Sequence, residues 1–71
     1  MTYGQALRTL MKKQGVSQIE LAARLGKTRG YVSQLMSGTI GEPKLRRAYE
    51  IADALDVPLD AFTDLMYQDG E

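Results

Sequence analysis

Arg29 and Gln34 carry planar side chains that can form paired hydrogen bonds with a flat partner. The guanidinium fork of arginine matches O6 and N7 of guanine, and the glutamine amide matches N6 and N7 of adenine. Val32, Leu35 and Met36 recur at spacings of three and four, so they share the inward face of a helix. The opposite face contains no acidic or large aliphatic residue that would oppose contact with DNA, and consists of Arg29, Gly30, Ser33, Gln34 and Ser37.

Two small residues lie between the two planar ones. Gly30 would let the helix end approach bases closely, although it could also be a weak helix former tolerated near a terminus. Ser33 could contact a base or be an ordinary solvated residue. An isolated arginine or glutamine on an exposed helix is usually solvated too, so the interpretation depends on the elements around it. The candidate base-reading residues are Arg29, Gly30, Ser33 and Gln34.

A second set of polar residues could hold a nucleic-acid backbone around this face. Hydroxyls, amides, lysine ammonium groups and the first amides of a helix can each bind a phosphate oxygen. Tyr31 could instead be a partly buried packing residue. Arg46 and Arg47 could bind phosphate or pair with Glu42 and Glu50. The candidate phosphate-binding residues are Gln18, Lys27, Thr28, Tyr31, Ser37, Thr39 and Lys44.

Charge is segregated along the chain, although its formal sum is zero. Residues 1–47 hold all nine basic residues and two of the nine acidic ones, which gives a net charge of +7. Residues 48–71 hold the other seven acidic residues and no basic one, which gives −7. A polyanion would be attracted to the first part and repelled by the second. Ordinary solvated charge remains an alternative, so the split constrains orientation more than it indicates binding.

The elements that would position these side chains are two short helices joined by a tight turn. Ala22 is small enough for the second helix to approach the first closely, and Val32 would fill the angle between them. Gly26 can adopt the positive φ that ends the first helix. This arrangement is a helix-turn-helix, which presents the outer face of its second helix to a DNA major groove.

Capping sequences and apolar spacing delimit the remaining helices. Thr2 with Gln5, and Ser17 with Glu20, resemble capping boxes. Pro43 is expected in the first turn of the fourth helix, a position that suits proline. The predicted helices cover residues 2–14, 17–25, 28–37, 43–55 and 58 to about 67.

Apolar faces on the last two predicted helices complete a core. No stretch shows the alternation of a strand, so the fold class is all-α: a compact five-helix domain over residues 1–67, with a frayed tail at 68–71. The expected inward residues are Leu45, Ala48, Ile51, Ala52 and Leu55 in the fourth helix, and Leu59, Phe62, Leu65 and Met66 in the fifth.

Composition argues against several classes of function. The chain has no cysteine and no histidine, so disulfides and thiolate or imidazole zinc sites are excluded, and no metal or cofactor is expected. Acid–base catalysis would fall to carboxylates that follow helix surfaces; solvated charge or a divalent-ion site are the alternatives there. We expect no catalytic residue and no enzyme. No apolar run of about 18 residues and no secretory signal is found, which favours a cytoplasmic protein.

Residues 16–22, 31–34, Pro43 and 51–57 resemble the phage repressor and Cro-like family, also called the xenobiotic-response-element (XRE) family of helix-turn-helix regulators. The resemblance covers about residues 4–66. It implies a lambda-repressor-like domain that binds operator DNA, commonly as a symmetric dimer, and so regulates transcription. The family's DNA-contacting positions correspond here to Gln18, Thr28, Arg29, Gly30, Ser33 and Gln34.

The chain departs from that family at one pair of positions. Many members carry an arginine late in the first helix and a glutamate near the end of the third, and these form a buried ion pair. Met11 and Met36 occupy those positions here. Replacing both charged partners with apolar groups is often neutral or stabilising, whereas losing one strands a charge. We therefore predict that Met11 and Met36 touch in the core.

The expected function is sequence-specific DNA binding, most simply by a repressor. A dimer would recognise an inverted repeat, with Met66 and Tyr67 as candidate interface residues unless they pack within one chain. The same fold would suit an antitoxin with a separate toxin partner, or the controller protein of a restriction–modification system. A protein-interaction module that uses the last helix is the alternative from another class.

Overall fold

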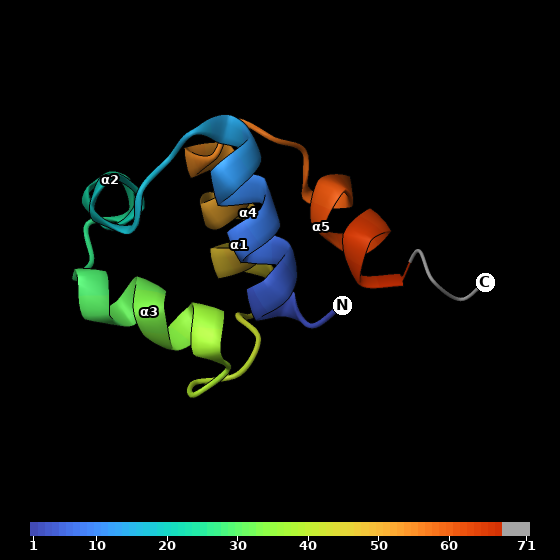
Figure 1. The fold of residues 1–71 in the computed structure, drawn as a ribbon, viewed down its shortest axis with the longest axis horizontal. Coiled ribbons are helices and arrows are strands. Elements are labelled where there is room, and N and C mark those ends of the chain that lie inside the picture. The colour runs from blue at the N-terminus through green and yellow to red at the C-terminus, as the bar shows by residue number, and fades with distance from the viewer. Residues whose placement is uncertain (68–71) are drawn as a thin grey trace.

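Five helices joined by loops make up residues 1–67, the part of the chain that the structure, a computed structural model, describes (Figure 1). In chain order they are α1 (Tyr3–Gln14), α2 (Gln18–Leu25), α3 (Arg29–Ser37), α4 (Leu45–Ala54) and α5 (Leu59–Tyr67). These residues contain no strand, so the predicted all-α fold is confirmed. None of the five helices is long and apolar enough to cross a bilayer. The tail predicted at 68–71 lies outside the described residues.

Side-chain caps begin α1 and α2 as the sequence predicts. Thr2 Oγ1 accepts a hydrogen bond from the Gln5 amide at 3.2 Å, and Gln5 Oε1 accepts one from the Thr2 amide at 2.9 Å. Ser17 and Glu20 form the same reciprocal pair, with both distances at 3.1 Å. These bonds satisfy amides that a helix start would otherwise leave unpaired. Both capping boxes are therefore confirmed.

The turn between α2 and α3 is fixed by its backbone. Gly26 has a φ of 69°, in the left-handed region that any side chain disfavours. The Lys27 amide donates to the Ala22 carbonyl at 2.9 Å, which satisfies an acceptor at the end of α2. Thr28 then caps α3, because its hydroxyl oxygen accepts from the Tyr31 amide at 3.2 Å. The predicted turn and the predicted end of α2 at Gly26 are confirmed.

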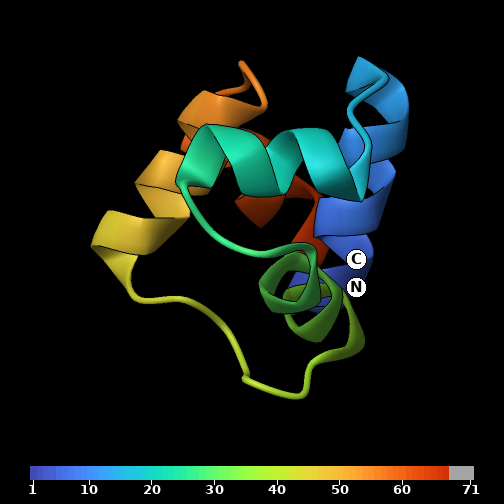
Figure 2. The same ribbon diagram turned by 90° about the vertical axis from the view of Figure 1, so that its left-hand side faces the viewer.

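The core lies among all five helices, each of which contributes buried side chains. α1 packs against α3 and α5, α2 packs against α3 and α4, and α4 packs against α5. Figure 2 shows α2 lying across the front of the molecule with α3 nearly end-on beneath it. The largest fully buried side chains come from every helix and are Phe62, Leu7, Leu21, Leu35, Ile51, Leu55 and Val32.

The start of α1 contributes two buried residues that the sequence did not reveal. The Tyr3 ring stacks on Phe62, with centroids 5.0 Å apart and planes at 10°. Burial raises the pKa of the Tyr3 hydroxyl, and the nearby Tyr31 and Glu42 raise it further. Gly4 lies directly against α3, where an added Cβ would overlap the Met36 carbonyl. This crossing holds the C-terminal end of α3 against α1.

The start of α4 differs from the prediction. Pro43 was expected in the first turn of the helix, but α4 begins at Leu45, and Lys44 is its N-cap. Leu45 was expected in the core, yet its side chain is 67% exposed. Its neighbours on the predicted face, Ile51 and Leu55, are buried. The first turn of α4 follows the loop directly and lies outside the core. Leu45, the first apolar residue of α4, therefore stays in solvent.

Five other residues expected to face the core are only partly buried, namely Met36, Ala48, Leu59, Leu65 and Met66. Leu59 at the start of α5 is half-buried and packs on the core, whereas Phe62 is 1% exposed. Met11 is buried at 5% exposure, and the half-buried Met36 packs against the same apolar cluster. Both methionines thus contribute to one cluster, and their direct contact remains a prediction.

Candidate nucleic-acid interface

The outward face of α3 gathers the candidate base-reading residues on one surface. Val32 and Leu35 face the core at 0% and 1% exposure, which fixes the rotation of the helix. No acidic residue occurs between positions 28 and 39. This rotation turns Ser37 to solvent together with the four candidate base-reading residues Arg29, Gly30, Ser33 and Gln34.

Gly30 leaves an open approach to the first turn of α3. A Cβ placed there would meet only the Thr28 hydroxyl, at 3.7 Å, which is an ordinary contact. The fold itself therefore does not require glycine at this position. The lack of a side chain bares the helix backbone on the same face as Arg29 and Gln34.

The N-terminal turn of α2 carries Gln18, which is half-buried. Its Oε1 is buried and accepts no hydrogen bond from any described residue. A buried acceptor without a donor is uncommon in folded proteins. The side-chain amide nitrogen and the first amides of α2 can still donate to an anion there.

Tyr31 stands at the junction of the turn, α3 and α4. It is half-buried and packs against the core, in agreement with the packing alternative for this residue. Lys27 Nζ lies 5.7 Å from its ring centroid, and the Arg47 guanidinium carbon lies 6.0 Å from it. Both distances are compatible with cation–π attraction. The ring thus holds two cations from different elements together.

The end of α3 and the following loop are joined by hydroxyl groups. Ser37 Oγ donates to the Gln34 carbonyl at 3.2 Å and is hydrogen-bonded to Thr39 Oγ1 at 2.7 Å. The Thr39 amide also donates to Ser37 Oγ, at 3.3 Å. Both residues are exposed, so they remain accessible while their hydroxyls shape the start of the loop.

The basic residues of this region differ in whether an acidic side chain pairs with them. Arg47 Nη1 lies 2.9 Å from Glu50 Oε1, which confirms the pairing alternative for Arg47. Within residues 1–67, no acidic side chain pairs with Arg46 or with the exposed Lys27, Arg29 and Lys44. The last three charges therefore stay uncompensated around α3.

Arg24 has a structural role that the sequence did not reveal. Its Nη1 donates to the Ala54 carbonyl at 2.7 Å, and its Nη2 lies 4.0 Å from Glu20. The first contact joins the end of α2 to the last turn of α4, where carbonyls lack helical partners, and the second lies within α2. No local sequence pattern predicts a hydrogen bond between residues 30 positions apart.

The far end of the molecule presents an apolar surface. α5 lies at the opposite end of the long axis from α2 and the start of α3 (Figure 1). Tyr67 is 71% exposed, and Met66 is half-buried against the core. Together with Leu45 and Leu59 they border a shallow groove between α4 and α5.

Comparison with known proteins identifies relatives of this fold. A family model described as helix-turn-helix matches residues 7–62. An uncharacterized HTH-type transcriptional regulator, y4dL, of Sinorhizobium fredii is 42% identical over 55 residues, which cover 78% of this chain. The chain spans only 28% of that relative's length.

A solved structure resembles the whole arrangement. The restriction-modification controller protein C.AhdI from Aeromonas hydrophila superposes with a TM-score of 0.75 and 33% identity. The match covers 84% of this chain and 89% of that one. The chain therefore belongs to the helix-turn-helix family, the phage repressor and Cro-like (XRE) group whose motifs its sequence resembles.

Proposed function

We propose that this chain is a sequence-specific DNA-binding regulator of transcription that inserts α3 into the major groove and acts by binding rather than by catalysis. The observation that carries the proposal is the acid-free exposed face of α3, which includes Arg29 and is flanked by Lys27 and Lys44; within residues 1–67 no acidic side chain pairs with these three cations. Such a face offers hydrogen bonds to bases and attraction to phosphates. As a regulator of transcription, the protein would act in the cytoplasm.

Base reading is assigned to the first turns of α3. Arg29 would pair with O6 and N7 of a guanine, and Gln34 with N6 and N7 of an adenine. Gly30 would let the helix end lie close to the bases, and Ser33 would donate to a neighbouring base. The backbone would be held on both sides of the groove by Gln18, Lys27, Thr28, Tyr31, Ser37, Thr39 and Lys44.

A symmetric homodimer is the proposed binding unit. The exposed Tyr67 and the half-buried Met66 would meet their counterparts across a two-fold axis. The molecule is 36 Å long, with α3 beginning near one end and α5 at the other (Figure 1). Two half-sites on one face of the DNA require the two copies of α3 to lie about one helical turn apart, about 34 Å. The operator would then be an inverted repeat, bound most simply as a repressor.

Control of a restriction–modification system is the second candidate. It is favoured by the similarity to the controller protein C.AhdI, which extends over 89% of that chain. The first candidate is supported by the HTH-type regulator from Sinorhizobium fredii. Both roles use the same DNA contacts and differ in the genes that they control. An antitoxin with a separate toxin partner would also use this surface, and only co-purification with a toxin would favour it.

The decisive test has two stages. Titration of binding to random-sequence duplexes against salt should give a steep fall of log affinity with log salt concentration, because each phosphate contact contributes a slope of about 0.9. Selection of bound sequences from a random pool should then return an inverted repeat. Absence of binding at low salt would refute DNA binding. A selected single half-site would refute the dimer alone.

A further inference from the structure

Tyr31 brings together two positive charges that are 20 positions apart in the sequence. Lys27 reaches its ring from the turn before α3, and Arg47 reaches it from the first half of α4. Both cations lie over the ring near the outer limit of cation–π contact, at 5.7 and 6.0 Å from its centroid. The two charges thus lie beside α3 without belonging to it.

Arg47 differs from Lys27 because an acidic residue already pairs with it. Glu50 Oε1 lies 2.9 Å from Arg47 Nη1, one turn further along α4. The two side chains are 33% and 49% exposed, respectively, so the pair stands at the surface rather than in the core. A guanidinium has five N–H donors, and this contact occupies one terminal nitrogen. The remaining donors are available to a second anion.

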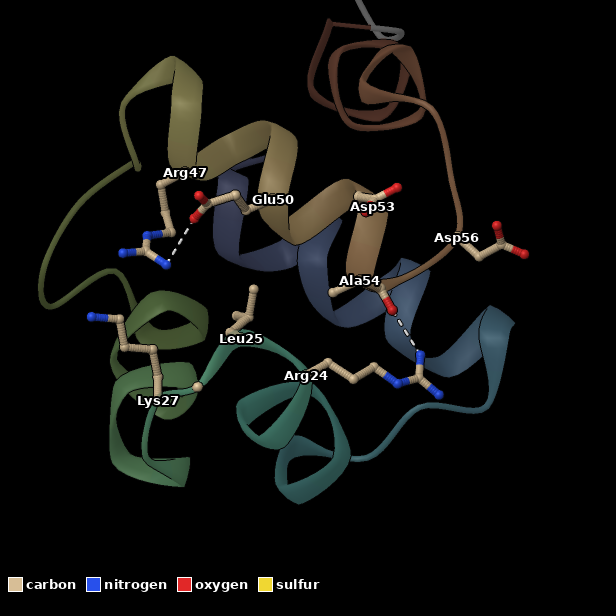
Figure 3. Close-up of a pocket in the computed structure, with 9 residues that line it drawn as sticks. Arg24, Leu25, Lys27, Arg47, Glu50, Asp53, Ala54 and Asp56 are labelled. Carbon is tan, nitrogen blue, oxygen red and sulfur yellow. Dashed lines mark hydrogen bonds and ion pairs between the residues drawn. The ribbon is translucent and has the colours of Figure 1, made fainter.

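An open groove between the end of α2 and α4 runs past this pair (Figure 3). Its basic end holds Lys27 and Arg47, and its other end holds Asp53 and Asp56. Arg24 also lines the groove, but its guanidinium is bonded to the Ala54 carbonyl at that other end. Of the cations that line this groove, Lys27 and Arg47 are therefore the two next to α3. Glu50 lies between them and the acidic end of the groove.

We propose that Arg47, Lys27 and Tyr31 together bind one DNA phosphate, and that Glu50 weakens this contact by compensating the charge of Arg47. The inference rests on the proposed function, because the phosphate belongs to the backbone flanking the groove that α3 reads. Glu50 is the first acidic residue of the negative part of the chain and pairs directly with a cation beside α3. Because the Glu50 carboxylate already compensates the charge of Arg47, the guanidinium gains less from pairing with a phosphate.

The test is a set of four variants measured against salt on a short random duplex that accommodates one copy. Glu50→Gln removes the charge but keeps a carbonyl oxygen that can accept from Arg47. We expect roughly 3- to 10-fold tighter binding at low salt and a salt slope steeper by up to about 0.9. Arg47→Gln should weaken binding and reduce the slope by a similar amount. Asp60→Asn, an exposed acid on α5, is the matched control and should change affinity by less than about 2-fold.

The double variant Arg47→Gln/Glu50→Gln shows whether Glu50 acts through Arg47. We expect it to bind like Arg47→Gln alone, because Glu50 then has no paired cation to compensate. An equal gain from Glu50→Gln in both backgrounds would overturn the inference in favour of general repulsion. Unchanged or weaker binding of Glu50→Gln, with normal salt-dependent binding of the wild-type chain, would overturn the inference alone. A wild-type chain that binds no duplex would overturn the proposed function as well.

Discussion

Arg29 and Lys44 lie on the same proposed contact surface but would meet different parts of the DNA. Arg29 occupies the first turn of α3, where side chains face base edges, whereas Lys44 caps α4 beside the loop. Arg29→Ala should relax specificity at one base pair, with a loss of about 1–3 kcal/mol. Lys44→Ala should weaken every sequence alike and reduce the salt slope by about 1.

Gel-shift titrations on a selected operator and its single-base variants distinguish the two effects. An Arg29→Ala loss that is uniform over all variants would make Arg29 a phosphate contact. A Lys44→Ala loss confined to one base pair would make Lys44 a base reader. Both residues are exposed, so neither substitution removes a buried contact of the fold.

Met11 and Met36 offer a second test at single residues. Met11 is 5% exposed, so Met11→Arg would bury a charge with no partner and should destabilise the protein by about 3–5 kcal/mol. Adding Met36→Glu should recover part of that loss if the two side chains touch. A double-mutant cycle by urea unfolding measures the coupling, which we expect to exceed about 1 kcal/mol. Additive losses would show that the two methionines do not meet.

At the scale of the elements, two glycines fix how helices meet, for different reasons. Gly26 needs a positive φ of 69° but has empty space around it, so Gly26→Ala should cost about 1–2 kcal/mol through the backbone alone. Gly26→Asn should recover part of this, because asparagine tolerates the left-handed region. Gly4 has no such φ; an added Cβ there overlaps the Met36 carbonyl.

Gly4→Ala should therefore cost about 1–3 kcal/mol or more by pushing α1 away from α3. Gly4→Ser should be at least as damaging, since the larger residue cannot relieve the overlap. Urea unfolding of the four variants checks both cases. A Gly4→Ser variant as stable as wild type would refute the close crossing, and a Gly26→Asn variant worse than Gly26→Ala would refute the backbone explanation.

The helices could be predicted where their signals are local. The Thr2–Gln5 and Ser17–Glu20 boxes each form within four consecutive residues, so the sequence contains the whole interaction. The start of α4 could not be predicted in this way. Its position depends on how the loop after α3 returns to the core, and that left Leu45 in solvent against the apolar pattern.

In the candidate site, too, only the features that depend on local spacing could be predicted from the sequence. The rotation of α3 follows from Val32 and Leu35, so the residues on its outer face could be predicted from spacing. Contacts between different elements could not be predicted from spacing. The approach of Arg47 to Tyr31 and the bond from Arg24 to the Ala54 carbonyl both depend on the angle between helices, which no local pattern specifies.

At the scale of the whole molecule, the opposite charges of the two parts of the chain should respond oppositely to salt. The basic part carries the proposed DNA surface, and added salt weakens binding there by reducing counterion release. Residues 48–71 carry seven acidic residues and include α5, the proposed dimer helix. Two such surfaces repel each other, and salt screens that repulsion. The homodimer should therefore tighten as salt rises, while DNA affinity falls.

Tyr67→Asp tests the dimer surface directly. Tyr67 is 71% exposed, so stability should change by no more than about 0.5 kcal/mol, but a charge would enter an apolar interface. Sedimentation equilibrium should show loss of the dimer. Affinity for an inverted repeat should fall by about 10-fold or more, because two linked half-sites then bind separately. Affinity for a single half-site should not change, since α3 is untouched. Equal losses on the half-site and on the inverted repeat would place Tyr67 within the fold or the DNA contact instead of between two copies.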